Sequence, residues 1–147
     1  GHSVNSEQWG AYFAQRLATR TEALGAETNL GAAVHRGRRK IMDEDMPCCV
    51  VVEGAENSKG QAGRGATVKV ELPIALHAYV PCDPNNPNLA GLAARRDMKR
   101  ALFTGDPAIT RLITYHGADV APRADGAAFV LSAIEVSVEV VEDLANP

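Results

Sequence analysis

Histidine serves in both metal binding and proton transfer, and this chain contains four histidines. They lie far apart, and none belongs to an H-x-x-x-H or H-E-x-x-H pattern, the spacings that place zinc ligands on one face of a helix. The four are His2, His35, His77 and His116. We therefore expect no metal site, and we expect His77 to be a solvated residue on the polar side of a strand.

The cysteine pattern argues against redox and zinc chemistry. The three cysteines are Cys48, Cys49 and Cys82, and no C-x-x-C pair occurs. An odd number with two adjacent members predicts neither a disulfide framework nor a zinc knuckle. Cys48 and Cys49 lie in the apolar run MPCCVVV, so we interpret both as small buried hydrophobic residues of a protein made in a reducing compartment.

Motifs for nucleophilic catalysis, phosphate binding and calcium binding are also missing from the sequence. No G-x-S-x-G elbow occurs. The glycines of 60–65 precede an expected strand, whereas a phosphate-binding loop must open a helix. The acidic run 43–45 lacks the alternating ligands of a calcium loop and is interpreted as a solvated turn. We therefore expect that the protein is not an enzyme and uses no cofactor.

Charged clusters are the remaining candidates for binding. The basic residues are Arg36, Arg38, Arg39 and Lys40 in one segment, and Arg95, Arg96, Lys99 and Arg100 along one side of an expected helix. Their acidic counterpart is the last expected strand and the tail, with Glu135, Glu139, Glu142 and Asp143. The basic clusters are either solvated faces or contacts for phosphates or an acidic protein surface. Opposite charges on one chain also suit head-to-tail packing of identical subunits in a ring.

Length and composition indicate one globular domain. The chain has 147 residues, of which 46% are hydrophobic and 22% charged, as is usual for a folded domain. Residues 1–3 have the composition of a remnant of a cleaved purification tag, which leaves 4–147 as the domain. The net charge of −3 gives no overall attraction to nucleic acid, and no apolar run is long enough to span a membrane.

The first half of the chain predicts a helix followed by strands. Residues 5–24 have an apolar face at the spacing of a helix, formed by Trp9, Phe13 and Leu17, with Leu24 near the same side. A short strand is expected within 32–41, and 46–53 is a continuous apolar run typical of a buried strand. The polar, glycine-rich segment 54–66 predicts a long mobile loop.

The clearest pattern lies in residues 67–80. Apolar residues occupy every even position, and the residues between them include Lys69, Glu71, His77 and Tyr79, which predicts one strand about 45 Å long. Pro73 cannot donate to a strand ladder, so it indicates an edge or a bulge. A helix over 88–103 follows, with Asp97 at the border of its apolar side. A weaker strand is expected at 109–120, then a hairpin turn at 123–126 and a second long amphipathic strand at 127–141.

These elements predict the α+β class. The order is α-β-β-β-α-β-β, which favours a mainly antiparallel sheet of four to five strands with two helices packed on one face. The two long strands extend further than a small globule requires. We therefore expect them to protrude or to pair with another chain through an exposed edge.

The order and pattern of these segments resemble the tail-terminator and tail-completion proteins of long-tailed bacteriophages, including minor tail proteins encoded by prophages. The resemblance covers about 5–142 and includes RRKIMDEDMPCCVVVEGAE, ATVKVELPIALHAYV, NPNLAGLAARRDMKRAL and ADGAAFVLSAIEVSVEV. It rests on element order, length and sequence pattern, because this family has no catalytic motif.

The resemblance implies a structural virion protein at the tail–neck junction, assembled in the cytoplasm of the bacterial host. It implies a homo-oligomer, a hexameric ring, that caps the tail tube, stops its polymerisation and offers a docking surface to head-connector proteins. Its partners would be further copies of itself, the tail-tube protein and the connector, with passing contact of DNA in a lumen and no membrane. The loop 54–66 would become ordered on docking. Two alternatives remain: another head–tail joining or neck subunit, and a small α+β module that binds nucleic acid or an acidic protein.

Overall fold

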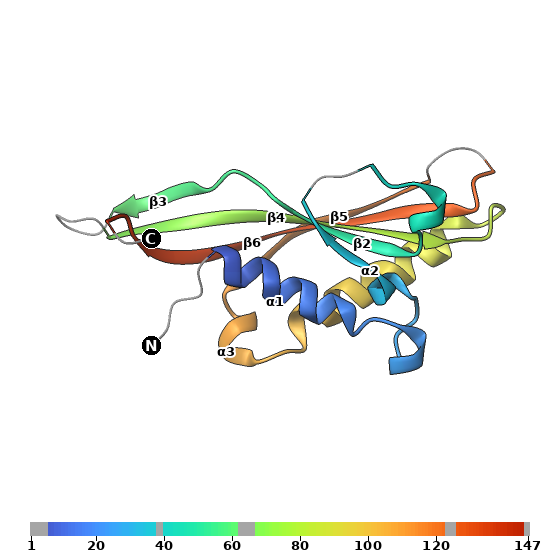
Figure 1. Cartoon of the computed structure of the whole chain (residues 1–147), viewed down its shortest axis with the longest axis horizontal. Coiled ribbons are helices and arrows are strands. Elements are labelled where there is room, and N and C mark those ends of the chain that lie inside the picture. The colour runs from blue at the N-terminus through green and yellow to red at the C-terminus, as the bar shows by residue number, and fades with distance from the viewer. Residues whose placement is uncertain (1–5, 38–39, 62–66, 123–125, 146–147) are drawn as a thin grey trace.

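The computed structural model describes residues 6–37, 40–61, 67–122 and 126–145, and within them a sheet forms one layer and helices the other (Figure 1). The sheet has six strands, and the helices pack on one of its faces, which confirms the predicted α+β class. Residues 1–3, Arg38, Arg39 and most of the expected turn at 123–126 lie outside the described residues.

The sheet order is β1-β2-β4-β6-β5, and β3 pairs with β4 as well. Every neighbouring pair is antiparallel except β1 and β2, which are parallel. The strands are β1 Val34–Arg36, β2 Cys48–Glu53, β3 Asn57–Gln61, β4 Thr67–Pro81, β5 Ile113–Pro122 and β6 Phe129–Asp143.

The strand β3 corrects the predicted loop over 54–66 at Asn57–Gln61, while residues 62–66 lie outside the described residues. Residues Asn57–Gln61 pair with β4, and a bulge falls between Ser58 and Gly60. Lys59 also forms a 3.4 Å ion pair with Glu71 of β4. A polar edge strand needs main-chain hydrogen bonds rather than apolar side chains, so the hydrophobic pattern gave no signal for it.

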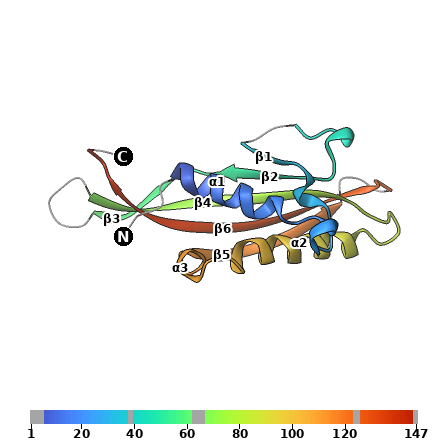
Figure 2. The same cartoon turned by 60° about the horizontal axis from the view of Figure 1, so that its bottom comes forward.

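The long alternating strand is present as predicted. β4 pairs with β6 along its whole length, from Thr67 opposite Asp143 to Pro81 opposite Phe129. The even-numbered residues of β4 from Val68 to Val80 are at most 5% exposed and belong to the core under the helices. Both views show β3 and the adjoining ends of β4 and β6 extending beyond α1, so the predicted protrusion is present (Figures 1 and 2).

Pro73, predicted to mark a sheet edge or a bulge, lies in a central strand at a point where pairing on one side is interrupted. On one side of β4, pairing with β2 stops at Ile74 and pairing with β3 starts at Glu71. The backbone nitrogen of Gly54 donates a 2.8 Å hydrogen bond to the Pro73 carbonyl in this gap. Since the N and C=O groups of one strand residue point to the same side, the proline nitrogen faces a position where the ladder is already interrupted.

The first helix, α1 (Ser6–Ala18), buries Trp9, Phe13 and Leu17 completely, as its spacing predicts. It ends earlier than expected. The Thr19 hydroxyl donates a 2.6 Å hydrogen bond to the Arg16 carbonyl just after its last turn, and residues 22–24 form a separate 3-10 helix. Leu24 is 68% exposed, so its expected place on the apolar face is wrong.

The second helix, α2 (Pro87–Phe103), lies beside α1 and packs on β4, β5 and β6. Ala94, Met98 and Leu102 are fully buried on its inner side. A Cβ added at Gly91 would lie 2.2 Å from Cγ1 of Val120 on β5, so glycine permits this close approach. A short helix, α3 (Pro107–Thr110), follows and leads into β5.

Candidate assembly surfaces

The face of the sheet opposite α1 and α2 is called here the open face. It contains the odd-numbered residues of β4 and their partners on β6, such as Ala75 opposite Glu135. In the described part of the chain, segment 40–47 covers one end of this face, where Ile41 and Met46 pack with Val50.

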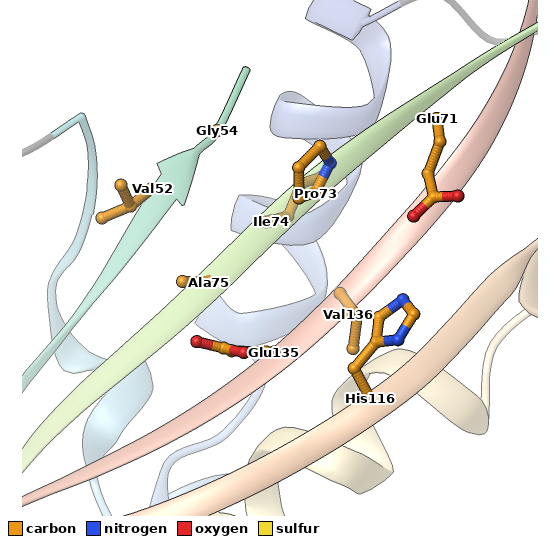
Figure 3. Close-up of a pocket in the computed structure, with 9 residues that line it drawn as sticks. All are labelled: Val52, Gly54, Glu71, Pro73, Ile74, Ala75, His116, Glu135 and Val136. Carbon is orange, nitrogen blue, oxygen red and sulfur yellow. The ribbon is translucent and has the colours of Figure 1, made fainter. Parts of the chain in front are cut away.

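A hollow of about 440 Å³ lies on the open face, where β2 ends and β5 changes register (Figure 3). Its base contains Pro73 and Ala75 of β4. Figure 3 shows Glu71 from β4 and His116 from β5 extending over β6 from opposite sides. The lining residues are Val52, Gly54, Glu71, Pro73, Ile74, Ala75, His116, Glu135 and Val136. Such a shallow, mixed surface suits a protein partner better than a small substrate.

Carboxylates dominate the charge of the open face. Glu71 lies directly opposite Glu139 in the β4–β6 register. Each has a lysine neighbour: Lys59 at 3.4 Å from Glu71, and Lys69 at 3.1 Å from Glu139. These exposed pairs offset the repulsion between the two like charges. Glu135 is exposed and forms no ion pair with any residue that the structure describes.

His116 lies in a β-bulge of β5, where the register shifts between Tyr115 and Gly117. Its Nε2 atom is 2.7 Å from the hydroxyl of Ser137 on β6, which is 5% exposed. The bulge makes the outer edge of β5 irregular, which disfavours uncontrolled pairing with another strand. A second hollow of about 190 Å³ adjoins it, lined by Gly117, Ala118, Asp119, Ala133 and Glu135.

The basic residues of α2 contact different partners within the same chain. Arg96 makes a bidentate contact with Glu27 at 2.8 and 2.9 Å, and Arg100 binds the same carboxylate at 2.9 Å. These hydrogen bonds, Arg96 first, lower the pKa of Glu27 from 4.5 to about 2. The Lys99 ammonium lies 4.9 Å from the ring centroid of Tyr115. The four residues thus do not form the single free basic face that the helix pattern predicts.

Asp97 was placed by its sequence position at the border of the apolar side of α2, a position that does not reveal how deeply the carboxylate is buried. The residue is fully buried. Its carboxylate accepts hydrogen bonds from the backbone of Glu27 at 3.1 Å, the backbone of Thr28 at 2.7 Å and the Thr28 hydroxyl at 2.6 Å. These donors replace water around the charge. The sequence offers no local signal for them, because they come from a loop about 70 residues earlier, at separations of 69 and 70.

The other charged candidates lie elsewhere. Arg36 is on β1 and forms a 2.8 Å ion pair with Glu53 of β2. Lys40 is exposed, and Arg38 and Arg39 lie outside the described residues. Glu142 and Asp143 are at the end of β6, opposite Val68 and Thr67. The structure therefore places Glu135 and Glu139 on one surface and the α2 residues on the other side of the molecule.

Two of the three cysteines, Cys48 and Cys49, are small buried residues of the core, as predicted. Cys48 and Cys49 are fully buried, and burial together with the neighbouring Cys48 raises the pKa of Cys49. Among residues 6–37, 40–61, 67–122 and 126–145, no group of three potential metal ligands comes together. No described helix is both long and apolar enough to cross a membrane.

Comparison with known proteins gives a likeness of fold. No protein-family model matches this chain, and no curated protein is similar to it in sequence. A solved structure described as the virion of a native gene transfer agent (GTA) particle contains a similar chain. The TM-score is 0.53 at 12% sequence identity, and the match covers 88% of this chain and 94% of that chain. The two chains therefore share a fold over nearly their whole lengths.

Proposed function

We propose that this chain is a structural, non-catalytic virion protein that acts as a tail terminator. In this role it forms a ring, a hexamer by the family resemblance, that caps the tail tube and ends its polymerisation. The ring then offers its outer surface to the head-connector proteins at the tail–neck junction. The fold shared with a chain of a gene transfer agent virion, over 88% of this chain and 94% of that one, is the observation that best supports the proposal.

The surface chemistry supports an assembly role in a second way. The open face offers shallow hollows between exposed strands, with carboxylates and small residues rather than a deep, apolar site. The opposite layer presents exposed leucines beside arginines on α2. Contacts of this kind are typical of protein–protein interfaces, where a few apolar and arginine residues supply most of the binding free energy.

The alternative of a nucleic-acid-binding module is less well supported. Arg96 and Arg100 share the carboxylate of Glu27, so the net positive charge of α2 is smaller than a backbone of phosphates would require. The open face has a predominance of carboxylates, which repel phosphates. A mobility-shift assay at low salt would detect binding if this alternative were right, and we expect none.

Electron microscopy of tail tubes tests the proposal. Tubes polymerised from the tail-tube protein of the same particle are mixed with this protein, and their ends are imaged in negative stain. We expect a ring-shaped density at one end of each tube. Density on isolated connectors but never on tubes would instead favour the neck-subunit alternative, and density on neither would overturn the proposed function.

A further inference from the structure

We propose that the open face of one subunit is covered by the outer side of α2 of the next subunit, a second copy of this chain. This inference rests on the proposed ring and names the two surfaces that form it. The acceptor surface is defined as Glu71, Ala75, Asp119, Ala133 and Glu135. The donor surface is defined as Leu89, Leu92, Arg96, Lys99, Arg100 and Phe103.

The acceptor surface has both room and charge for a helix. Its two hollows, of about 440 and 190 Å³, share Glu135 as a lining residue. Ala75 and Ala133 line them, one in each, and are too short to fill the space above the strands. Neither Glu135 nor Asp119 forms an ion pair with another part of the described chain. The surface therefore combines shallow apolar depressions with two carboxylates, Glu135 and Asp119, that lack a countercharge.

The donor surface is apolar and basic on one arc of α2. Leu89 is 65% exposed, and Leu92 and Phe103 are each 38% exposed, which is unusual for large apolar residues on a helix that has a well-packed inner side. The spacing of 89, 92, 96, 99, 100 and 103 places all six positions on the side opposite the buried Ala94 and Met98.

The charge of the donor side is positive after its internal contacts are counted. Arg95, Arg96, Lys99 and Arg100 supply four positive charges on α2. Arg95 is only partly exposed and lies outside the donor surface, so the surface itself has three of these charges; Glu27 and Asp97 are in contact with them, which leaves an excess of one. An approaching acidic surface would therefore be attracted, while the exposed leucines would lie over the alanine-lined hollows.

The two surfaces lie on opposite sides of a two-layer molecule, with α2 on one side of the sheet and the open face on the other (Figures 1 and 2). The helix layer of one copy can thus stack on the bare sheet of the next. Such a contact is heterologous, because it joins different surfaces, and it builds a ring when the rotation between successive copies closes. It would cover the open face with a helix, where the described residues of the single chain place segment 40–47 over one end.

Analytical ultracentrifugation of paired variants tests this interface. The acceptor variant is Glu135→Lys with Asp119→Lys, and the donor variant is Leu89→Ser with Leu92→Ser, which gives the altered donor no charge that could attract the altered acceptor. All four positions are exposed, so thermal unfolding should report folded proteins. Glu7→Lys, an exposed charge reversal on α1 outside both surfaces, is the matched control.

We expect the wild type and the Glu7→Lys control to assemble, and each interface variant alone to raise the dissociation constant by at least about thirtyfold. An equimolar mixture of the two variants should form dimers and nothing larger, because the mixture retains one intact donor and one intact acceptor. Assembly of either variant like the wild type, rings in the mixture, or a wild type that stays monomeric at its highest soluble concentration would overturn the inference.

A tube-capping assay distinguishes failure of this interface from failure of the proposed function. If both interface variants still assemble and cap tubes, the interface is wrong and the tail-terminator function stands. If the wild type assembles through this interface but leaves tube ends bare, the interface stands and the function is wrong.

Discussion

Asp97 of α2 accepts a 2.7 Å hydrogen bond from the backbone nitrogen of Thr28, and the Thr28 hydroxyl donates to the same oxygen at 2.6 Å. This contact attaches the segment after α1 to the inner side of α2, 69 residues later in the chain. Because the contact is buried, the two helices are held together by polar as well as apolar contacts.

Asp97→Asn should destabilise the protein by about 2–4 kcal/mol, because the new NH₂ group cannot accept from the donors that face Asp97. Urea unfolding followed by circular dichroism measures this change. Asp106→Asn is the matched control, since Asp106 accepts from the exposed backbone of Ala108 at 2.9 Å and asparagine serves equally well at such a cap. Equal effects of the two substitutions would show that the buried contact contributes little.

The Glu27 contacts predict a pH-dependent contribution to stability. The pKa of Glu27 is lowered to about 2 in the folded protein, from 4.5 when free. Its stabilising contribution is therefore complete above pH 4.5 and is lost as the pH falls towards 2. The pair is exposed to solvent, so Glu27→Gln should cost no more than about 1 kcal/mol near neutral pH. Denaturation of both proteins across this range should show the difference shrinking in acid, and a constant difference would contradict the ion pairs.

Gly91→Ala should destabilise the protein by about 1–3 kcal/mol, although alanine is the better helix former. The added Cβ would meet Cγ1 of Val120 at 2.2 Å. Combining it with Val120→Ala removes that methyl group, so the double variant should lose less stability than the two single changes added together. A strictly additive double-variant cycle in thermal unfolding would mean that the helix can move away from β5 at little cost.

The cysteines should differ in reactivity towards a thiol reagent. Cys48 and Cys49 are fully buried and should react only after unfolding. Cys82 is partly exposed, but burial and the charge of Asp83 raise its pKa, so it should react slowly at neutral pH and faster as the pH rises. Absorbance after addition of Ellman's reagent, with and without denaturant, distinguishes the three. Rapid labelling of all three in the native protein would contradict the packing of β2.

The sequence predicts the parts of this fold that have a regular apolar period. The even positions of β4 and the Trp9–Phe13–Leu17 spacing lead directly to the buried faces found in the structure. It does not predict β3, whose polar residues are held by main-chain pairing to β4. Such pairing depends on a neighbour already in place, and no local pattern encodes it.

The candidate surfaces were only partly predictable from the sequence, because some of their contacts also join segments that are far apart in the chain. Glu135 and Glu139 follow from strand alternation, and the structure places both on the open face. The neutralising role of Glu27 towards Arg96 and Arg100 was missed, because it joins residues 69 and 73 positions apart. His116 was recognised only as an isolated histidine, and its place beside Ser137 depends on a register shift that sequence periodicity does not reveal.

The most direct test of the tail-terminator proposal is the growth of tail tubes in the presence of this protein. Tube length is measured by electron microscopy at a fixed time after the protein is added to growing tubes, with an equal amount of the donor variant as the comparison. We predict that the wild-type protein stops elongation, so that tubes keep the length they had at addition. Continued growth at the same rate as in untreated samples would contradict a tail-terminator function.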